Sequence, residues 1–202
     1  MRLLVILALL GFAALLGSYR PSAVSDGAGH PTQGAASSGG TGLILQQSEG
    51  ERRVRRPRPF SGAPMSAPSL IIKVDGRNGG SPDFFLGYEE IAPGGAIAAH
   101  SHPEYDEILI VQQGKGLATL GSQERVVTAG ATIYIPPNTR VSLKNTGKQA
   151  LGLHFIFPRP EMVSEYYRGM TVAEGERAVP FSAEEFAAFR ARHRGHIVFD
   201  ER

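Results

Sequence analysis

From about residue 68 onward, the sequence consists of short β-type segments that recur about every ten residues. Each segment alternates or clusters β-branched and aromatic residues, and Gly, Pro, Asn or Asp separates it from the next. The segments are LIIKVDG, DFFLGYEEI, AIAAHSH, EILIVQQ, LATLGSQ, RVVTAG, TIYIPP, RVSLKN and LGLHFIF. Short strands at such even spacing predict an all-β domain built as an antiparallel β-sandwich or barrel.

The last part of the chain changes to helical signals. Ser182 begins SAEE, a capping box in which the Ser182 hydroxyl accepts from a backbone N–H of the first turn and the Glu185 carboxylate accepts from the backbone N–H of Ser182. A helix is therefore predicted over about 183–193, and a shorter one is expected within 160–170. Both helices are expected to pack on the outside of the β-domain.

The chain before the β-rich region has a different composition. Residues 1–24 are predicted to form a signal peptide or membrane anchor. Arg2 precedes an uninterrupted apolar run from Leu3 to Gly17, which has the length of a signal-peptide core and is short for a membrane span. Export to the periplasm or the medium is predicted, and an uncleaved signal would instead anchor the protein in a membrane. Residues 25–67 are rich in Gly, Ser, Pro and Ala and predict a disordered linker. The β-domain then occupies 68–158, and a helical extension occupies 159–202.

The distribution of charge excludes one class of partner. The chain carries a formal net charge of +2, but five arginines lie within ERRVRRPRPF at 51–60. From Ala67 to the C-terminus, 14 Lys and Arg stand against 16 Asp and Glu, a net charge of −2. The folded part is therefore not expected to bind nucleic acid. The arginine cluster is expected to be solvated, and contact with an anionic lipid or docking of a partner stays open.

The absence of cysteine limits any metal site to nitrogen and oxygen ligands. Two of the six histidines, His100 and His102, lie two residues apart, so in a strand they point to the same face. A turn follows, and Glu107 opens the return strand on the face of Leu109 and Val111. Two imidazoles and one carboxylate on a rigid β-frame form a three-point site for a divalent metal.

The stretch from Gly94 to Gly114 resembles the first motif of the cupin superfamily. The motif runs Gly, five residues, His-x-His, four residues, Glu, six residues, Gly, and the sequence G-GAIAA-HSH-PEYD-E-ILIVQQ-G fills every position. The resemblance implies a cupin-type jelly roll, with His100, His102 and Glu107 as the metal ligands. It also implies pairing of two copies through edge strands, so we expect a homodimer.

The second cupin motif matches residues 130–145, G-ATIYI-PPN-TR-V-SLK-N, with two departures. Asn138 stands where the motif has a glycine, and asparagine tolerates the left-handed backbone that glycine would supply. Val141 stands where the family has its usual third imidazole. His154 on a later strand is a candidate replacement, although a structural role is favoured because its neighbours occupy the opposite face.

Five other polar residues are candidates for lining a pocket beside the metal: Tyr105, Gln112, Tyr134, Arg140 and His154. Tyr105 lies in the turn next to the site, and the others belong to strands in which every second residue faces inward. His193 and His196 lie among Arg and Gly past the last helix. They are expected at a solvated helix end and are excluded from the site.

The ligand set favours iron(II) or manganese(II), while zinc and nickel stay open. By resemblance to cupin oxygenases, a small enol, phenol or keto acid would bind beside the metal. Glu107 would act as a ligand or, when displaced, as the catalytic base. A lyase or isomerase is an open alternative with the same parts, and so is a noncatalytic module that binds a small ligand.

Overall fold

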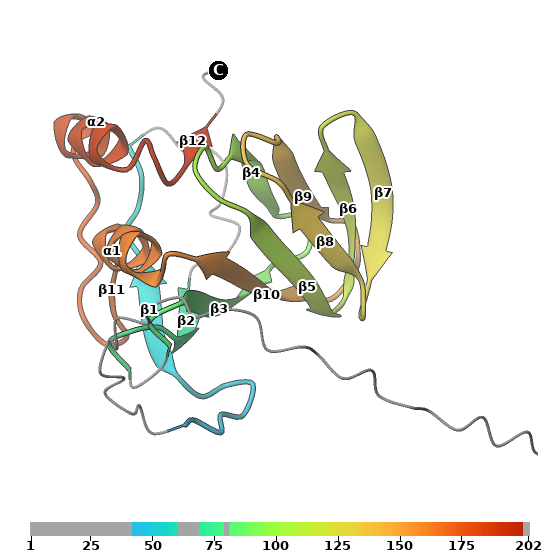
Figure 1. Ribbon diagram of the computed structural model, residues 1–202, viewed down its shortest axis with the longest axis horizontal. Helices are drawn as coiled ribbons and strands as arrows, with labels where there is room; N and C mark the ends of the chain where they lie inside the picture. Colours follow the sequence, from blue (N-terminus) through green and yellow to red (C-terminus); the bar gives the residue numbers. More distant parts are fainter. Residues whose placement is uncertain (1–41, 60–68, 79–80, 200–202) are drawn as a thin grey trace, which may run out of the picture. The chain divides into compact units, whose positions relative to one another are not determined.

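The computed structural model describes residues 42–59, 69–78 and 81–199, which form two antiparallel β-sheets with helices α1 and α2 (Figure 1). The seven-stranded sheet has the order β11-β1-β2-β3-β10-β5-β8, and the five-stranded sheet has the order β12-β4-β9-β6-β7. The strands are β1 (Glu51–Arg55), β2 (Ser69–Val74), β3 (Phe84–Ile91), β4 (Ala96–Ser101), β5 (Glu107–Gln113), β6 (Lys115–Leu120), β7 (Gln123–Thr128), β8 (Thr132–Ile135), β9 (Val141–Asn145), β10 (Leu151–Pro158), β11 (Thr171–Ala173) and β12 (Val198–Phe199). The predicted all-β jelly-roll architecture is confirmed.

Each of the nine predicted segments forms a strand, and burial shows why. In β5, Glu107, Leu109 and Val111 are buried while the residues between them are more exposed, so the alternation in the sequence gives one inward face. Phe85 on β3 and Phe155 on β10 stack at a ring-centroid distance of 6.0 Å. Inward side chains of both sheets, such as these, make one continuous hydrophobic core.

Backbone geometry explains the choice of residue at two turn positions. Asn138 has φ 59°, the left-handed conformation that was predicted for it from the motif. Gly114 has φ 85°, and a Cβ there would lie 2.5 Å from the carbonyl oxygen of Ala150. Glycine is required at that position because both the backbone angle and the close approach exclude a side chain.

Both predicted helices are present. α2 (Ala183–Arg192) begins at the capping box, with the Ser182 hydroxyl accepting from the Glu185 N–H at 3.0 Å. α1 (Pro160–Met170) is slightly the longer of the two, whereas a shorter helix was expected there. α1 buries Val163 in the core, while α2 buries none of its residues.

The predicted linker at 25–67 is wrong for its arginine-rich part. Residues 51–55 form β1, which pairs with both β2 and β11. The segment has no hydrophobic period because its contacts are polar: the Arg53 guanidinium donates to the Thr171 hydroxyl at 2.6 Å and to the Glu51 carboxylate at 2.6 Å. These ion pairs and side-chain hydrogen bonds take the place of the apolar face that strand prediction depends on.

The C-terminal extension is also not purely helical, since β11 extends the seven-stranded sheet and β12 pairs with β4. The predicted signal or anchor at 1–24 lies outside the described residues, as do 25–41 and 60–67 of the linker. Within the described ranges, neither helix is long and apolar enough to cross a membrane.

Candidate metal centre

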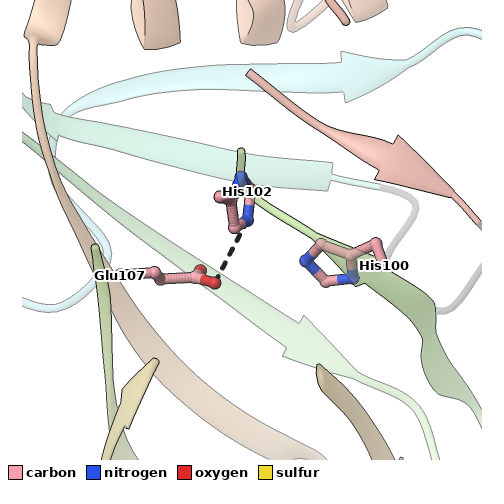
Figure 2. Close-up of side chains that lie close together, drawn as sticks. All are labelled: His100, His102 and Glu107. Carbon is pink, nitrogen blue, oxygen red and sulfur yellow. Dashed lines mark ion pairs between the residues drawn. The ribbon is translucent and has the colours of Figure 1, made fainter. Parts of the chain in front are cut away.

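His100, His102 and Glu107 come together as the spacing predicted (Figure 2). His100 lies near the end of β4, His102 follows that strand, and Glu107 is the first residue of β5. One potential ligand atom from each residue lies within 4.8 Å of the other two. The three residues are 6%, 1% and 5% exposed, so the cluster is shielded from solvent.

A bulge in β4 directs His100 inward. The pairing of β4 with β9 shifts register between Ile97 and His100, and both of these side chains line the same cavity. Residues three apart in a regular strand would face opposite sides, so the extra residue of the bulge re-aims the imidazole. The Nδ1 atom of His100 then donates to the carbonyl oxygen of Ala98, within the bulge, at 2.8 Å.

The second imidazole is oriented by a residue far away in the sequence. The Nδ1 atom of His102 donates to the carbonyl oxygen of His196 at 2.5 Å. A carbonyl oxygen can only accept, so the hydrogen of each neutral ring lies on Nδ1 and the Nε2 lone pair stays available. Metal-binding histidines in proteins are oriented in this way by their second nitrogen.

The centre of the cluster holds two atoms that do not satisfy each other. His102 Nε2 and Glu107 Oε2 are 3.3 Å apart, and both are buried without a hydrogen-bond partner in the part of the chain that the structure describes. A neutral His102 with its hydrogen on Nδ1 places a lone pair against a carboxylate oxygen. Such an arrangement is costly unless a cation or a proton lies between the two acceptors. The donor set therefore fits a divalent metal ion.

Burial keeps the imidazoles of His100 and His196 neutral. It lowers the pKa of His100 from its ordinary value, and the nearby carboxylate of Glu107 offsets this only in part. Burial, together with His102 and His100, holds the pKa of His196 well below its usual range. A neutral imidazole is the form that binds a metal, so His100 is in the state that coordination requires.

A small cavity of about 60 Å³ adjoins His100 and Glu107. Both sheets, α1, β12 and the segment after β1 contribute to its wall. The lining residues are Arg55, Arg58, Glu89, Ile97, Ala98, His100, Glu107, Leu109, Val141, Leu143, Phe155, Tyr166, Tyr167, Ile197 and Phe199. Val141 pairs with His100 across β4 and β9, so the position where the cupin motif has a histidine does face the cavity.

The predicted pocket residues lie elsewhere. Tyr105 is buried beside His102 and forms a hydrogen bond with His196 Nδ1, but it does not line the cavity. Tyr134 is 56% exposed, and its hydroxyl donates to Asp106 at 2.8 Å. Arg140 is exposed and also lies outside the cavity wall.

Gln112 and His154 lie on the outer face of the seven-stranded sheet. They line a separate pocket of about 350 Å³, because Leu109, Val111, Leu153 and Phe155 take the inward positions of the same strands. The predicted structural role of His154 is consistent with this place, where its ring lies 5.1 Å from that of Tyr88.

The structure corrects the prediction for the C-terminal histidines. His196 is fully buried, and its ring lies 5.1 Å from the ring of His102. His193 is 5% exposed and contacts Tyr166. Their sequence surroundings are polar, so nothing in the local pattern indicates burial. The pairing of β12 with β4, with Phe199 opposite His100, brings this segment to the site.

Part of this chain is similar to known proteins. Residues 87–157 match the family model described as a cupin domain. An uncharacterized protein of Methanocaldococcus jannaschii is 39% identical over 64 residues, which cover 31% of this chain and 51% of that protein. The tetracenomycin polyketide synthase protein TcmJ of Streptomyces glaucescens is 26% identical over 87 residues, covering 41% and 58%. The chain thus spans about half the length of the curated relatives it matches.

Among solved structures, a predicted oxalate decarboxylase from Thermotoga maritima superposes with a TM-score of 0.49 at 16% identity. The match covers 58% of this chain and 99% of that protein. An uncharacterized protein with a double-stranded β-helix domain from Klebsiella pneumoniae gives a TM-score of 0.41 at 19% identity, over 52% of this chain and 85% of that one.

Proposed function

We propose that this chain, which belongs to the cupin superfamily, binds one divalent metal ion and a small organic ligand beside it. The premise is its cupin domain at residues 87–157. His100, His102 and Glu107 would hold the ion. The observation that carries the proposal is the pair of buried acceptors, His102 Nε2 and Glu107 Oε2, which face each other at 3.3 Å.

The donor types favour iron(II) or manganese(II). Two imidazoles and a carboxylate suit first-row divalent metals, and three protein ligands leave open positions. When bound, such an ion would supply Lewis-acid or redox chemistry to a ligand in the cavity. The protein's own contribution is to orient both imidazoles through Ala98 and His196 and to exclude water with the apolar part of the wall.

The activity that we propose is oxygenation of a small organic substrate. The two-histidine, one-carboxylate set supports this choice, because it is typical of iron(II) oxygenases. The apolar side chain of Val141 in the cavity wall supports a second candidate, a noncatalytic module that binds a small ligand, since the site has one imidazole fewer than the full cupin motif.

Metal titration of the metal-free protein tests the proposal. We expect the wild type to bind about one equivalent of manganese(II), or of iron(II) without oxygen, in isothermal titration calorimetry. His102→Ala and Glu107→Gln should each weaken binding by more than about 100-fold, because each removes a ligand. His154→Ala is the matched control, since that half-buried histidine lies on the outer face of β10 and should leave affinity unchanged.

Equal affinity in His102→Ala and the wild type, with circular dichroism showing both folded, would reject the metal centre. Oxygen consumption on addition of small enols, phenols or keto acids then separates the two candidates. Ligand affinity that survives removal of the metal, without any oxygen consumption, would favour the noncatalytic module.

A further inference from the structure

We propose that the cavity beside the metal centre binds a small carboxylate anion, whose acid group pairs with the guanidinium of Arg55. This inference rests on the proposed function, because it names the class of ligand for the same cavity. It comes from the part of the cavity wall that β1, β3 and α1 supply and that the two cupin motifs do not include.

Arg55 has hydrogen-bonding capacity left for a ligand. Its side chain is only 12% exposed, and one of its terminal nitrogens donates to the Glu89 carboxylate at 2.5 Å. That is the single hydrogen bond of the Arg55 side chain among the residues that the structure describes. A guanidinium carries five N–H groups, so several of them remain for an acceptor in the cavity. Carboxylates match this planar fork in two-point contacts.

Two hydroxyl groups support the same ligand chemistry. Tyr166 and Tyr167 on α1 both line the cavity. Burial raises the pKa of both phenols above the ordinary value, most strongly for Tyr167, so each remains protonated and able to donate. One small cavity is therefore lined by a guanidinium and two phenols, all of which can donate hydrogen bonds.

The charges of the wall favour an anion once the metal is present. Arg55 and Arg58 bring two positive charges, and Glu89 and Glu107 bring two negative charges. A divalent ion adds two positive charges to this balanced set. A carboxylate beside the ion reduces the excess positive charge. The attraction between the carboxylate and the ion is strong in a site of low dielectric constant.

The size and the remaining wall limit the rest of the ligand. The cavity measures about 60 Å³, and apolar side chains such as Leu143, Phe155 and Ile197 form much of its surface. Only a few non-hydrogen atoms fit, and those away from the acid group would contact apolar carbon. The expected ligand is a free acid of about two to four carbons.

Propionate and propionamide make a matched pair of probes, since they share their shape and differ in charge. Binding to the manganese-loaded protein is measured by calorimetry and, for the metal-free protein, by NMR titration. We expect the loaded protein to bind propionate at least about tenfold more tightly than propionamide, because only the anion pairs with Arg55 and offsets the metal charge.

Three variants test the role of Arg55. Arg55→Lys keeps the charge and loses the planar fork, and it should weaken propionate binding about tenfold or more. The double variant Arg55→Gln/Glu89→Gln removes both members of the ion pair together. It leaves no unpaired buried charge, so it guards against a loss of binding that comes only from unfolding. Arg52→Gln is the control, because Arg52 lies on the same strand but is exposed and pairs with Glu174.

The outcomes separate this inference from the proposed function. Metal binding without propionate binding, or with propionate affinity equal in Arg55→Lys and the wild type, overturns the carboxylate site and leaves the metal centre standing. Propionate binding that depends on Arg55 in a protein that takes up no metal supports the carboxylate site and rejects the metal centre.

Discussion

The two walls of the cavity come from different kinds of sequence. The metal-centre wall is local, because His100 in β4 and Glu107 in β5 lie on either side of one turn, and His102 lies in that turn. The other wall joins β1 and β3 to α1 and the C-terminal segment, and more than a hundred residues separate β1 from α1. Short sequence spacings therefore define the three metal-binding residues. The side chains that would select a small organic ligand come together only through contacts between distant segments of the chain. Variants in this second wall should test whether it contributes to stability and metal binding as the metal-centre wall does.

The largest expected effect in the second wall follows from breaking its ion pair. Arg55→Met leaves the Glu89 carboxylate, 8% exposed in its side chain, without its partner. We expect a loss of about 3–5 kcal/mol in the free energy of unfolding, because an unpaired buried charge is expensive. Urea denaturation of the metal-free protein measures this loss.

The control for that experiment is the exposed pair on the same strand. Arg52 and Glu174 are 43% and 55% exposed in their side chains, so Arg52→Met should cost less than about 1 kcal/mol. The double variant Arg55→Met/Glu89→Met should recover most of the stability. Equal losses in Arg52→Met and Arg55→Met would show that the pair with Glu89 contributes no more than a surface contact.

A smaller effect is expected from the C-terminal segment, through the orientation of His102. A chain that ends at Gly195 lacks the His196 carbonyl that accepts from His102 Nδ1. We expect manganese affinity to fall by about 10–100-fold, the usual effect of losing a partner behind a ligand. A chain that ends at Phe199 keeps the carbonyl and is the control, and circular dichroism shows whether both chains are folded. Unchanged affinity in the shorter chain would mean that the β4 frame alone orients the ring.

The same contrast explains how much the sequence could predict. The nine strands, the capped helix and the His-x-His and Glu cluster follow from alternation, capping and short spacing, and the structure has them at the predicted residues. Val141 was correctly placed at the site because motif spacing fixes the register of β9.

The errors at β1 and at His196 share one cause, which is that tertiary contacts decide burial where the local pattern is polar. The arginine-rich strand β1 looked like a linker, because its ion-pair partners lie on β3 and α1 and on other distant elements. His196 looked solvated, although the rings of His102 and Tyr166 enclose it. Gln112 and Tyr134 were candidates for the pocket because the inward face of each strand was left open. Both lie on the outer face, as does His154, for which a structural role was favoured.

The smallest expected effect concerns His193, the other buried histidine of the C-terminal segment. Burial lowers the pKa of His193, Glu165 opposes this, and Arg192 reinforces it. The aromatic rings of Tyr166 and Phe189 pack against the imidazole. The folded protein therefore holds this ring neutral in conditions where the unfolded chain protonates it.

The sign of the pH dependence follows from that shift. With a folded pKa below the unfolded value of about 6.5, the contribution of His193 to stability is complete above pH 6.5. It is lost as the pH falls from there toward the folded pKa, at no more than about 1.4 kcal/mol per pH unit. We expect metal-free wild type to lose more stability between pH 7.5 and 5.5 than His193→Gln, as measured by urea denaturation. Equal losses would mean that the C-terminal segment opens readily enough for His193 to titrate as it does in the unfolded chain. The segment would then be held less firmly than the turn that carries the metal ligands.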